Sequence, residues 1–156
     1  MKRFFSIVAL VVVVIAFGAF VSTKTSQQLD FAANYSHGTI FVGTTTLSAL
    51  VSDTEDLRAK GLSGFSRLGR DQAMLFIFPS LGNWGFWMKD MNFSIDILWL
   101  DEDFRIITIE KSVAPSTYPK IFFPKSLARY VIELNAGTTD LFGVTIGDEL
   151  RFSLKK

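Results

Sequence analysis

The chain has no cysteine and a single histidine, His37. Without thiols it can form neither a disulfide nor a thiolate metal site, and no lipid can be attached to an N-terminal cysteine. A lone histidine cannot build a histidine metal site. The sequence also lacks a G-x-S-x-G nucleophile elbow, a phosphate loop and a dinucleotide fingerprint. We therefore expect no metal site and no cofactor, and nucleophilic catalysis is disfavoured.

An excess of charge of either sign is also missing. The 156 residues carry 16 basic and 15 acidic side chains, and two of the basic ones, Lys2 and Arg3, precede the first apolar run. No basic patch stands out in the remainder, so we expect no nucleic-acid partner. The apolar fraction of 49% and the aromatic fraction of 14% are sufficient for one domain with a packed core.

One long apolar run covers residues 4–21 and is interrupted only by Ser6. A helix of this length reaches roughly 27 Å, close to the hydrocarbon thickness of a bilayer. A cleaved signal peptide and a retained anchor both fit this run, and Ala16 and Gly18 satisfy the small-residue rule for cleavage. Because the run continues past them, we favour a signal anchor in residues 1–22. The domain would then be membrane-anchored outside the cytoplasm, or secreted or periplasmic if the segment is cleaved.

A polar segment, residues 23–38, follows and shows no sustained hydrophobic period, so we interpret it as a linker with His37 as a solvated residue. One globular domain is expected over residues 39–156. Within it, Ser112–Lys125 holds three of the four prolines together with Tyr118. This segment is too rich in proline for a strand and too apolar for a free linker. We predict a lid or flap that lies across the domain.

Short apolar, β-branched runs separated by glycine and proline turns dominate the domain. They predict strands at Thr39–Val42, Thr46–Val51, Met74–Phe78, Ile95–Leu100, Arg105–Lys111, Ala128–Leu134 and Glu149–Leu154. Two short helices are predicted, one from Thr54 to Lys60 after an Asp53 N-cap and one after the turn at Gly137. The pattern indicates a mainly β fold, either a sandwich or a partly open barrel.

The stretch WGFWMKDMNFSIDILWLD, residues 84–101, contains three tryptophans, two methionines and two phenylalanines. This much aromatic surface is expected in a core or around a pocket. Asp96 lies between Ile95 and Ile97, and a carboxylate in an apolar run must be paired, protonated or exposed to a cavity. The acidic residues 101–103 lack the glycine and the distal glutamate of an EF-hand loop, so we interpret them as a solvated hairpin turn.

Four ordered motifs resemble a known family. They are DTEDLRAKGL (53–62), AMLFIFP (73–79), FWMKDMNFSIDILWLD (86–101) and ARYVIELNAG (128–137). Together they resemble the domain of unknown function 192 family from about Thr39 to Phe152. The resemblance implies a compact, mostly β domain, often preceded by a signal or anchor segment, and it implies no reaction. Many relatives have cysteines where this chain has Ala114–Tyr118, so a thiol, disulfide or metal role of that segment does not carry over.

Strand alternation places Asp96, Leu98 and Leu100 on one face, and Arg129, Val131, Glu133 and Asn135 together on a face of another strand. If these strands are neighbours, the carboxylates of Asp96 and Glu133 could converge with Arg58 or Lys89. Two carboxylates in an apolar setting form a candidate acid/base pair. The alternative is a structural ion pair in which Arg58 or Arg129 neutralises one of them. The residues expected to bind a ligand are Arg58, Trp87, Lys89, Asp96, Tyr118, Glu133 and Asn135.

Three functions remain open at this point. The first, which we favour, is a membrane-tethered extracytoplasmic binding or accessory module that takes a small ligand, glycan or peptide in an aromatic cleft. The second is a hydrolase or lyase that uses Asp96 and Glu133. The third is an assembly partner of an envelope protein, through a sheet edge or an apolar patch.

Overall fold

The computed structural model describes residues 32–155. The globular domain is a compact unit that begins at Tyr35. Its elements are β1 (Ser36–Val42), β2 (Thr45–Ser52), α2 (Glu55–Lys60), β3 (Gln72–Gly82), β4 (Phe86–Trp87), β5 (Ile95–Leu100), β6 (Ile106–Val113), a 3-10 turn (Pro115–Thr117), β7 (Ile121–Phe122), β8 (Ala128–Asn135), α3 (Thr138–Leu141) and β9 (Arg151–Leu154). The mainly β fold with two short helices is therefore confirmed for this part of the chain. The predicted anchor or signal segment, residues 1–22, lies outside the described residues.

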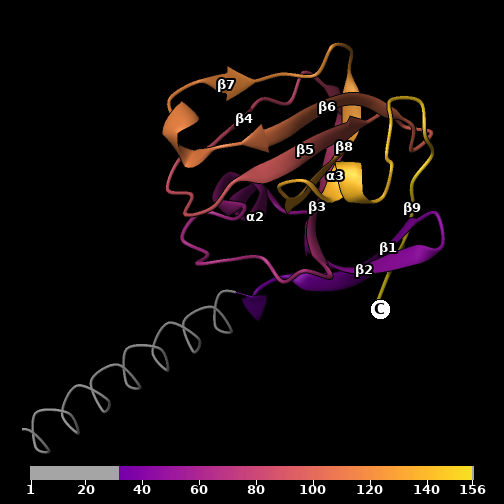
Figure 1. Ribbon diagram of the computed structural model, residues 1–156, viewed down its shortest axis with the longest axis horizontal. Helices are drawn as coiled ribbons and strands as arrows, with labels where there is room; N and C mark the ends of the chain where they lie inside the picture. Colours follow the sequence, from indigo (N-terminus) through magenta and orange to yellow (C-terminus); the bar gives the residue numbers. More distant parts are fainter. Residues whose placement is uncertain (1–31, 156) are drawn as a thin grey trace, which may run out of the picture. The chain divides into compact units, whose positions relative to one another are not determined.

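Seven strands form one sheet in the order β6-β5-β8-β3-β2-β1-β9, and β4 and β7 form a separate two-stranded ribbon (Figure 1). β2 and β3 run parallel, because the segment containing α2 carries the chain back across the sheet between them. The sheet curls, so that Phe104, which precedes β6, contacts Phe152 of β9 with ring centroids 5.2 Å apart. The segments at the starts of β6 and β9 are joined by an isolated bridge between Arg105 and Glu149 and by backbone hydrogen bonds from Leu150 to Phe104 and from Ile106 to Asp148. The sheet does not close into a barrel.

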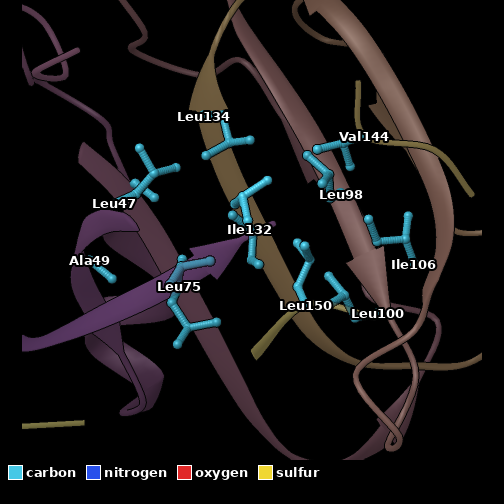
Figure 2. Close-up of a cluster of buried hydrophobic side chains, with 13 residues drawn as sticks. Leu47, Ala49, Leu75, Leu98, Leu100, Ile106, Ile132, Leu134, Val144 and Leu150 are labelled. Atoms are coloured by element: carbon cyan, nitrogen blue, oxygen red, sulfur yellow. The ribbon is translucent and has the colours of Figure 1, made fainter. Parts of the chain in front are cut away.

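Both faces of the sheet are buried at its centre, and all six residues of β5 are inaccessible to solvent. One face carries the aliphatic core of the curled sheet (Figure 2). Its members are Ile40, Val42, Leu47, Ala49, Ala73, Leu75, Leu98, Leu100, Ile106, Ile132, Leu134, Val144 and Leu150. The opposite face carries Phe76, Ile97 and Trp99, which are also buried. The alternation predicted for β5 and β8 therefore holds, with each face enclosed.

Three local features differ from the sequence expectation. β1 begins at Ser36, so His37 is an exposed strand residue rather than part of the linker. The N-cap of α2 is Thr54, whose hydroxyl accepts from the Leu57 N–H, and not Asp53. β3 continues past Pro79 to Gly82, because the register of its pairing with β8 shifts there and no ladder hydrogen bond is needed from the proline.

Within residues 32–155, no helix has both the length and the apolar character needed to span a membrane.

Candidate functional site

Asp96 and Glu133 lie on neighbouring strands but on opposite faces of the sheet. In the antiparallel register of β5 and β8, Glu133 is opposite Ile97, and Asp96 is opposite Leu134. Residues paired in this way point to the same face. Glu133 therefore belongs to the aromatic face, whereas Asp96 belongs to the face of the aliphatic core. The expected convergence of the two carboxylates is wrong, since the sheet itself separates them.

Asp96 is fully buried and accepts four hydrogen bonds. Its Oδ1 accepts from the N–H groups of Ser112 (2.8 Å) and Gly137 (3.2 Å), and its Oδ2 accepts from the N–H and hydroxyl of Thr139 (3.0 and 2.8 Å). The first turn of α3 and the end of β6 thus surround the carboxylate with donors. Such donors replace the water that a buried carboxylate loses, so Asp96 fastens α3 and β6 to β5.

Glu133 has the opposite environment. Its side chain is 5% exposed, and its Oε2 has no hydrogen-bond partner in the described part of the chain. Burial without such a partner raises its pKa from 4.5 to about 8, because the charged form loses its hydration. Burial, with a smaller contribution from the charge of Glu133, raises the pKa of Tyr35 to about 12. At neutral pH the carboxyl of Glu133 is therefore mainly protonated and able to donate a hydrogen bond.

No ion pair in residues 32–155 joins Arg58 or Arg129 to either buried carboxylate. The ion pairs there are exposed and join Arg105 to Glu149, Lys111 to Asp140 and Arg151 to Glu149. The structural ion pair considered from the sequence is therefore wrong. Backbone N–H groups stabilise one carboxylate, and protonation stabilises the other.

Glu133 lines a cavity of about 560 Å³ between α2, β3 and the segment leading into β4. The lining residues are Glu55, Arg58, Ala59, Lys60, Gly61, Leu62, Ser63, Phe76, Phe78, Pro79, Trp84, Gly85, Phe86, Trp87, Met91 and Glu133. The volume lies in the range of cavities that bind small organic molecules. Five of the lining side chains are aromatic, and the polar groups among them are few, as is typical of ligand sites.

The aromatic wall is held by ring contacts. Phe78 and Trp84 are stacked, with centroids 4.2 Å apart and planes at 9°. The Phe86 ring is nearly perpendicular to the rings of Phe76 and Trp99. Its centroid lies 4.8 Å from the Phe76 centroid and 5.8 Å from the Trp99 centroid. The Trp99 indole N–H donates to the carbonyl of Trp84 at 2.8 Å. These contacts fix the ring orientations before any ligand enters, which lowers the entropic cost of binding.

Arg58 is positioned in the cavity wall by carbonyl groups. Its Nη1 donates to the carbonyls of Asp53 (2.6 Å) and Ile77 (2.9 Å), and its guanidinium carbon lies 5.3 Å from the centroid of the Phe78 ring. Neither carbonyl carries a full charge, so the positive charge is not cancelled by a carboxylate. The wall therefore combines aromatic faces with the Arg58 guanidinium and the protonated Glu133 carboxyl, and Glu55 and Lys60 of α2 also line it.

The family can now be stated from the sequence match. Residues 38–152 match the domain of unknown function 192 family (DUF192), described as an uncharacterized ACR. This chain belongs to that family. The resemblance read from the four motifs is thus confirmed. No curated protein matches the chain.

Two solved structures are similar to this DUF192 domain. A proposed transcription regulator from Sinorhizobium meliloti 1021 is 28% identical, with a TM-score of 0.69 over 76% of this chain and 95% of its own. A protein of unknown function from Novosphingobium aromaticivorans DSM 12444 is 24% identical, with a TM-score of 0.68 over 74% of this chain and 83% of its own. The likeness to the second shows the fold alone.

Three of the seven residues expected to bind a ligand line the cavity of the DUF192 domain: Arg58, Trp87 and Glu133. The other four have different positions. Asp96 lies across the sheet, and Asn135 donates from Nδ2 to the carbonyls of Leu68 and Gly69.

Lys89 and Tyr118 contact Trp87 instead of lining the cavity. The Lys89 ammonium lies 5.9 Å from the Trp87 ring, and the Tyr118 ring centroid also lies 5.9 Å from it. Among residues 32–155, no group of three or more metal-binding side chains is close enough to hold a metal ion.

Phe76, Phe78 and Phe86 line the cavity, although none of them was among the residues expected from the sequence to bind a ligand. Tyr35 was assigned to the linker, yet it is buried and its hydroxyl donates to the carbonyl of Gly61 at 2.8 Å. Phe76 and Phe78 alternate with Leu75 and Ile77 along β3, and this period-2 pattern could have placed both on one face.

The predicted flap is ordered and docks on β4. Its β7 pairs with β4, so that Phe86 is opposite Phe122 and Trp87 is opposite Ile121. The flap approaches Gly85 so closely that a Cβ there would lie 2.6 Å from Phe123 Cε1 and 2.7 Å from Ile121 Cγ2. A larger residue at position 85 would therefore displace the side chains of Ile121 and Phe123 where the flap crosses the aromatic segment.

The variant G85A is expected to displace the flap and to lower the free energy of unfolding by about 1–3 kcal/mol, the usual cost of overpacking. Urea unfolding measures this loss. The loss should be much smaller in an I121A/F123A background, which removes the atoms that clash. Equal losses in both backgrounds would show that the flap does not rest on Gly85.

Proposed function

We propose that this protein is a membrane-tethered extracytoplasmic binding or accessory module that takes a small, uncharged ligand in the aromatic cavity. The single observation that carries the proposal is the buried Glu133 carboxyl, which lines the cavity with one oxygen left without a partner. Leaving a buried polar atom unpaired costs roughly 1–3 kcal/mol, and a ligand that pairs with it recovers part of this. Such groups in a preformed apolar cavity support a binding role.

The polar groups of the wall disfavour a cationic ligand. Glu133 holds its proton at neutral pH, and the Arg58 guanidinium lines the same wall. A cationic ligand would meet that guanidinium and would also have to displace the proton. A protonated carboxyl presents a donor beside an acceptor, which matches an amide, an N-acetyl group or adjacent hydroxyls. Glycan and peptide fragments carry these groups next to apolar faces that stack on aromatic rings.

The proposed location depends on residues 1–22 as a signal anchor and on the linker that follows. The description of the Sinorhizobium relative as a proposed transcription regulator is not extended to this chain, because the balanced charge does not favour nucleic acid. We do not favour the hydrolase or lyase alternative. It needs Asp96 and Glu133 to act on the same substrate bond as acid and base, and the two side chains point to opposite faces of the sheet.

The binding test uses tryptophan fluorescence, because Trp84 and Trp87 lie in the cavity wall. N-acetylated sugars and N-acetyl dipeptide amides serve as neutral probes, with matched amines and carboxylates as charged probes. We expect a saturable change with a neutral probe that is weaker in the variant W87F. A flat response to every neutral probe would contradict the proposal.

Two substitutions at Glu133 identify the protonation state that binds. E133Q is the isostere of the protonated acid, so binding of a neutral probe should stay within about threefold of the parent. E133A removes the hydrogen bond and should weaken binding by about tenfold, since such a bond contributes on the order of 1 kcal/mol or slightly more. Loss of binding in E133Q, together with binding of amines by the parent, would show instead that the ionised carboxylate receives a cation.

A further inference from the structure

An exposed apolar surface covers the outer side of the β4–β7 ribbon. Trp87 is 48% exposed, Tyr118 46%, Ile121 44% and Phe123 48%. The four belong together. Trp87 pairs with Ile121 and contacts the Tyr118 ring, and side-chain atoms of Ile121 and Phe123 both lie close to Gly85. We call these four residues the ribbon patch. The ribbon lies at the edge of the molecule, clear of β1 and β2 (Figure 1).

The fold itself does not require these side chains to be apolar. In a two-stranded ribbon, successive residues point to opposite sides. The inward pair, Phe86 and Phe122, packs toward the core and attaches the ribbon: Phe122 is buried, and Phe86 contacts Phe76 and Trp99. The outward pair, Trp87 and Ile121, does not attach the ribbon to the core. Trp87 also borders the cavity, yet it is 48% exposed, and Ile121 is 44% exposed. A contiguous exposed apolar surface beside a packed one is typical of a docking surface.

The charges around the ribbon patch have one predominant sign. Lys89, Lys120 and Lys125 are exposed and adjoin it in the chain, and the segment 112–127 contains no acidic residue. The Lys89 ammonium lies over the ring of Trp87, whereas the Lys120 ammonium lies 4.3 Å from the ring of the inward residue Phe122 and so on the inner side of the ribbon. Asp90 follows Lys89 and is the acidic residue nearest to it in the chain. The surface is therefore aromatic, aliphatic and cationic.

We infer that the ribbon patch docks on an anionic lipid bilayer, with its rings at the level of the headgroups and its lysines on the lipid phosphates. Tryptophan and tyrosine accumulate at the membrane–water interface, because their rings are apolar and their polar atoms reach water. Each lysine near an anionic leaflet adds roughly 1 kcal/mol of attraction. The two features together select an anionic membrane over a neutral one. Trp87 belongs to both the cavity wall and the ribbon patch, but the two proposals have separate tests, because ligand binding is measured with neutral probes and docking with the depth of a label and the lysine variants.

The absence of cysteine allows one spin label to be placed at a time on the full chain. The substitution S116C labels the flap beside Tyr118, and L141C labels the exposed Leu141 of α3, away from the ribbon. Both proteins are reconstituted in vesicles of phosphatidylcholine alone or with phosphatidylglycerol. Collisions of the label with oxygen and with a water-soluble nickel complex then report its depth. Because the parent and its variants share the same N-terminal segment, any difference arises from the domain.

We expect the label at position 116 to gain oxygen contact and lose nickel contact in the vesicles that contain phosphatidylglycerol, while the label at position 141 stays in water. The variant K89Q/K125Q should lower the ratio of docked to undocked domain by about thirtyfold, the effect of two such attractions. The matched variant R151Q/K155Q, which removes two charges from the region of β9, should change it little. A label at position 116 that stays in water in both lipids, or that is buried only when an envelope protein is added, would overturn the inference.

Discussion

The variant D96N is expected to lower the free energy of unfolding by about 3–5 kcal/mol, close to the whole stability margin of many small domains. Asp96 is completely buried, and all four of its partners are donors. The amide of asparagine has the same shape but presents an N–H₂ group to two of them. Donors would then face donors, and buried N–H groups would lose their acceptor.

Urea unfolding of D96N beside D140N separates this effect from a general effect of removing a carboxylate near α3. Asp140 lies on α3 itself, whereas Asp96 lies on β5 and contacts α3. Asp140 is exposed, and within residues 32–155 its side chain pairs with Lys111 at the surface. A surface pair contributes about 0–1 kcal/mol, so D140N should be nearly neutral. If D96N unfolded like the parent, Asp96 would not be the structural fastener that its hydrogen bonds indicate.

Raising the pH from 5 to 9 is expected to destabilise the protein, and E133Q should remove most of that dependence. Between pH 4.5, the pKa of a free glutamate, and about 8, the pKa of buried Glu133, the folded chain holds a proton that the unfolded chain has lost. Unfolding therefore releases a proton, and rising pH favours the unfolded state. The free energy of unfolding should fall by about 1.4 kcal/mol per pH unit within this window.

The control for Glu133 is E102Q, which removes an exposed carboxylate in the β5–β6 turn. Urea midpoints of the parent, E133Q and E102Q are compared at each pH. E133Q should match the parent near pH 5, where the carboxyl is protonated, and be more stable than the parent at pH 9. E102Q should follow the parent throughout. Parallel pH profiles for all three proteins would mean that Glu133 titrates like an exposed residue.

The two carboxyl groups thus differ in environment although both are buried. Asp96 accepts hydrogen bonds from three N–H groups and one hydroxyl, which connect α3 and β6 to β5. Glu133 is shielded from water, its Oε2 has no hydrogen-bond partner in the described residues, and it lies in the wall of a cavity. The variants D96N and D140N test whether Asp96 stabilises the fold. The variants E133Q and E133A test whether Glu133 binds a ligand.

Local chemistry in the sequence determined most of the elements. The apolar run Ile95–Leu100 is β5 as predicted, the Gly43 turn joins β1 to β2, and Gly61, with φ of 49°, ends α2. These features depend on neighbouring residues: hydrophobic period, capping, and the freedom of glycine at positive φ. The same alternation correctly grouped the residues of β5 and β8 into faces.

Only the tertiary structure decided which faces meet. The alternation of the sequence predicts that Asp96 and Leu98 lie on the same side of β5. It does not predict the register between β5 and β8, and a shift of one residue in that register would move Glu133 to the other side of the sheet. That register is set by side chains distant in sequence, including the aliphatic core in Figure 2. The cavity likewise forms only where α2, β3 and the aromatic segment of residues 84–87 come together. A periodic pattern carries no information about contacts of this kind, because it describes one strand at a time.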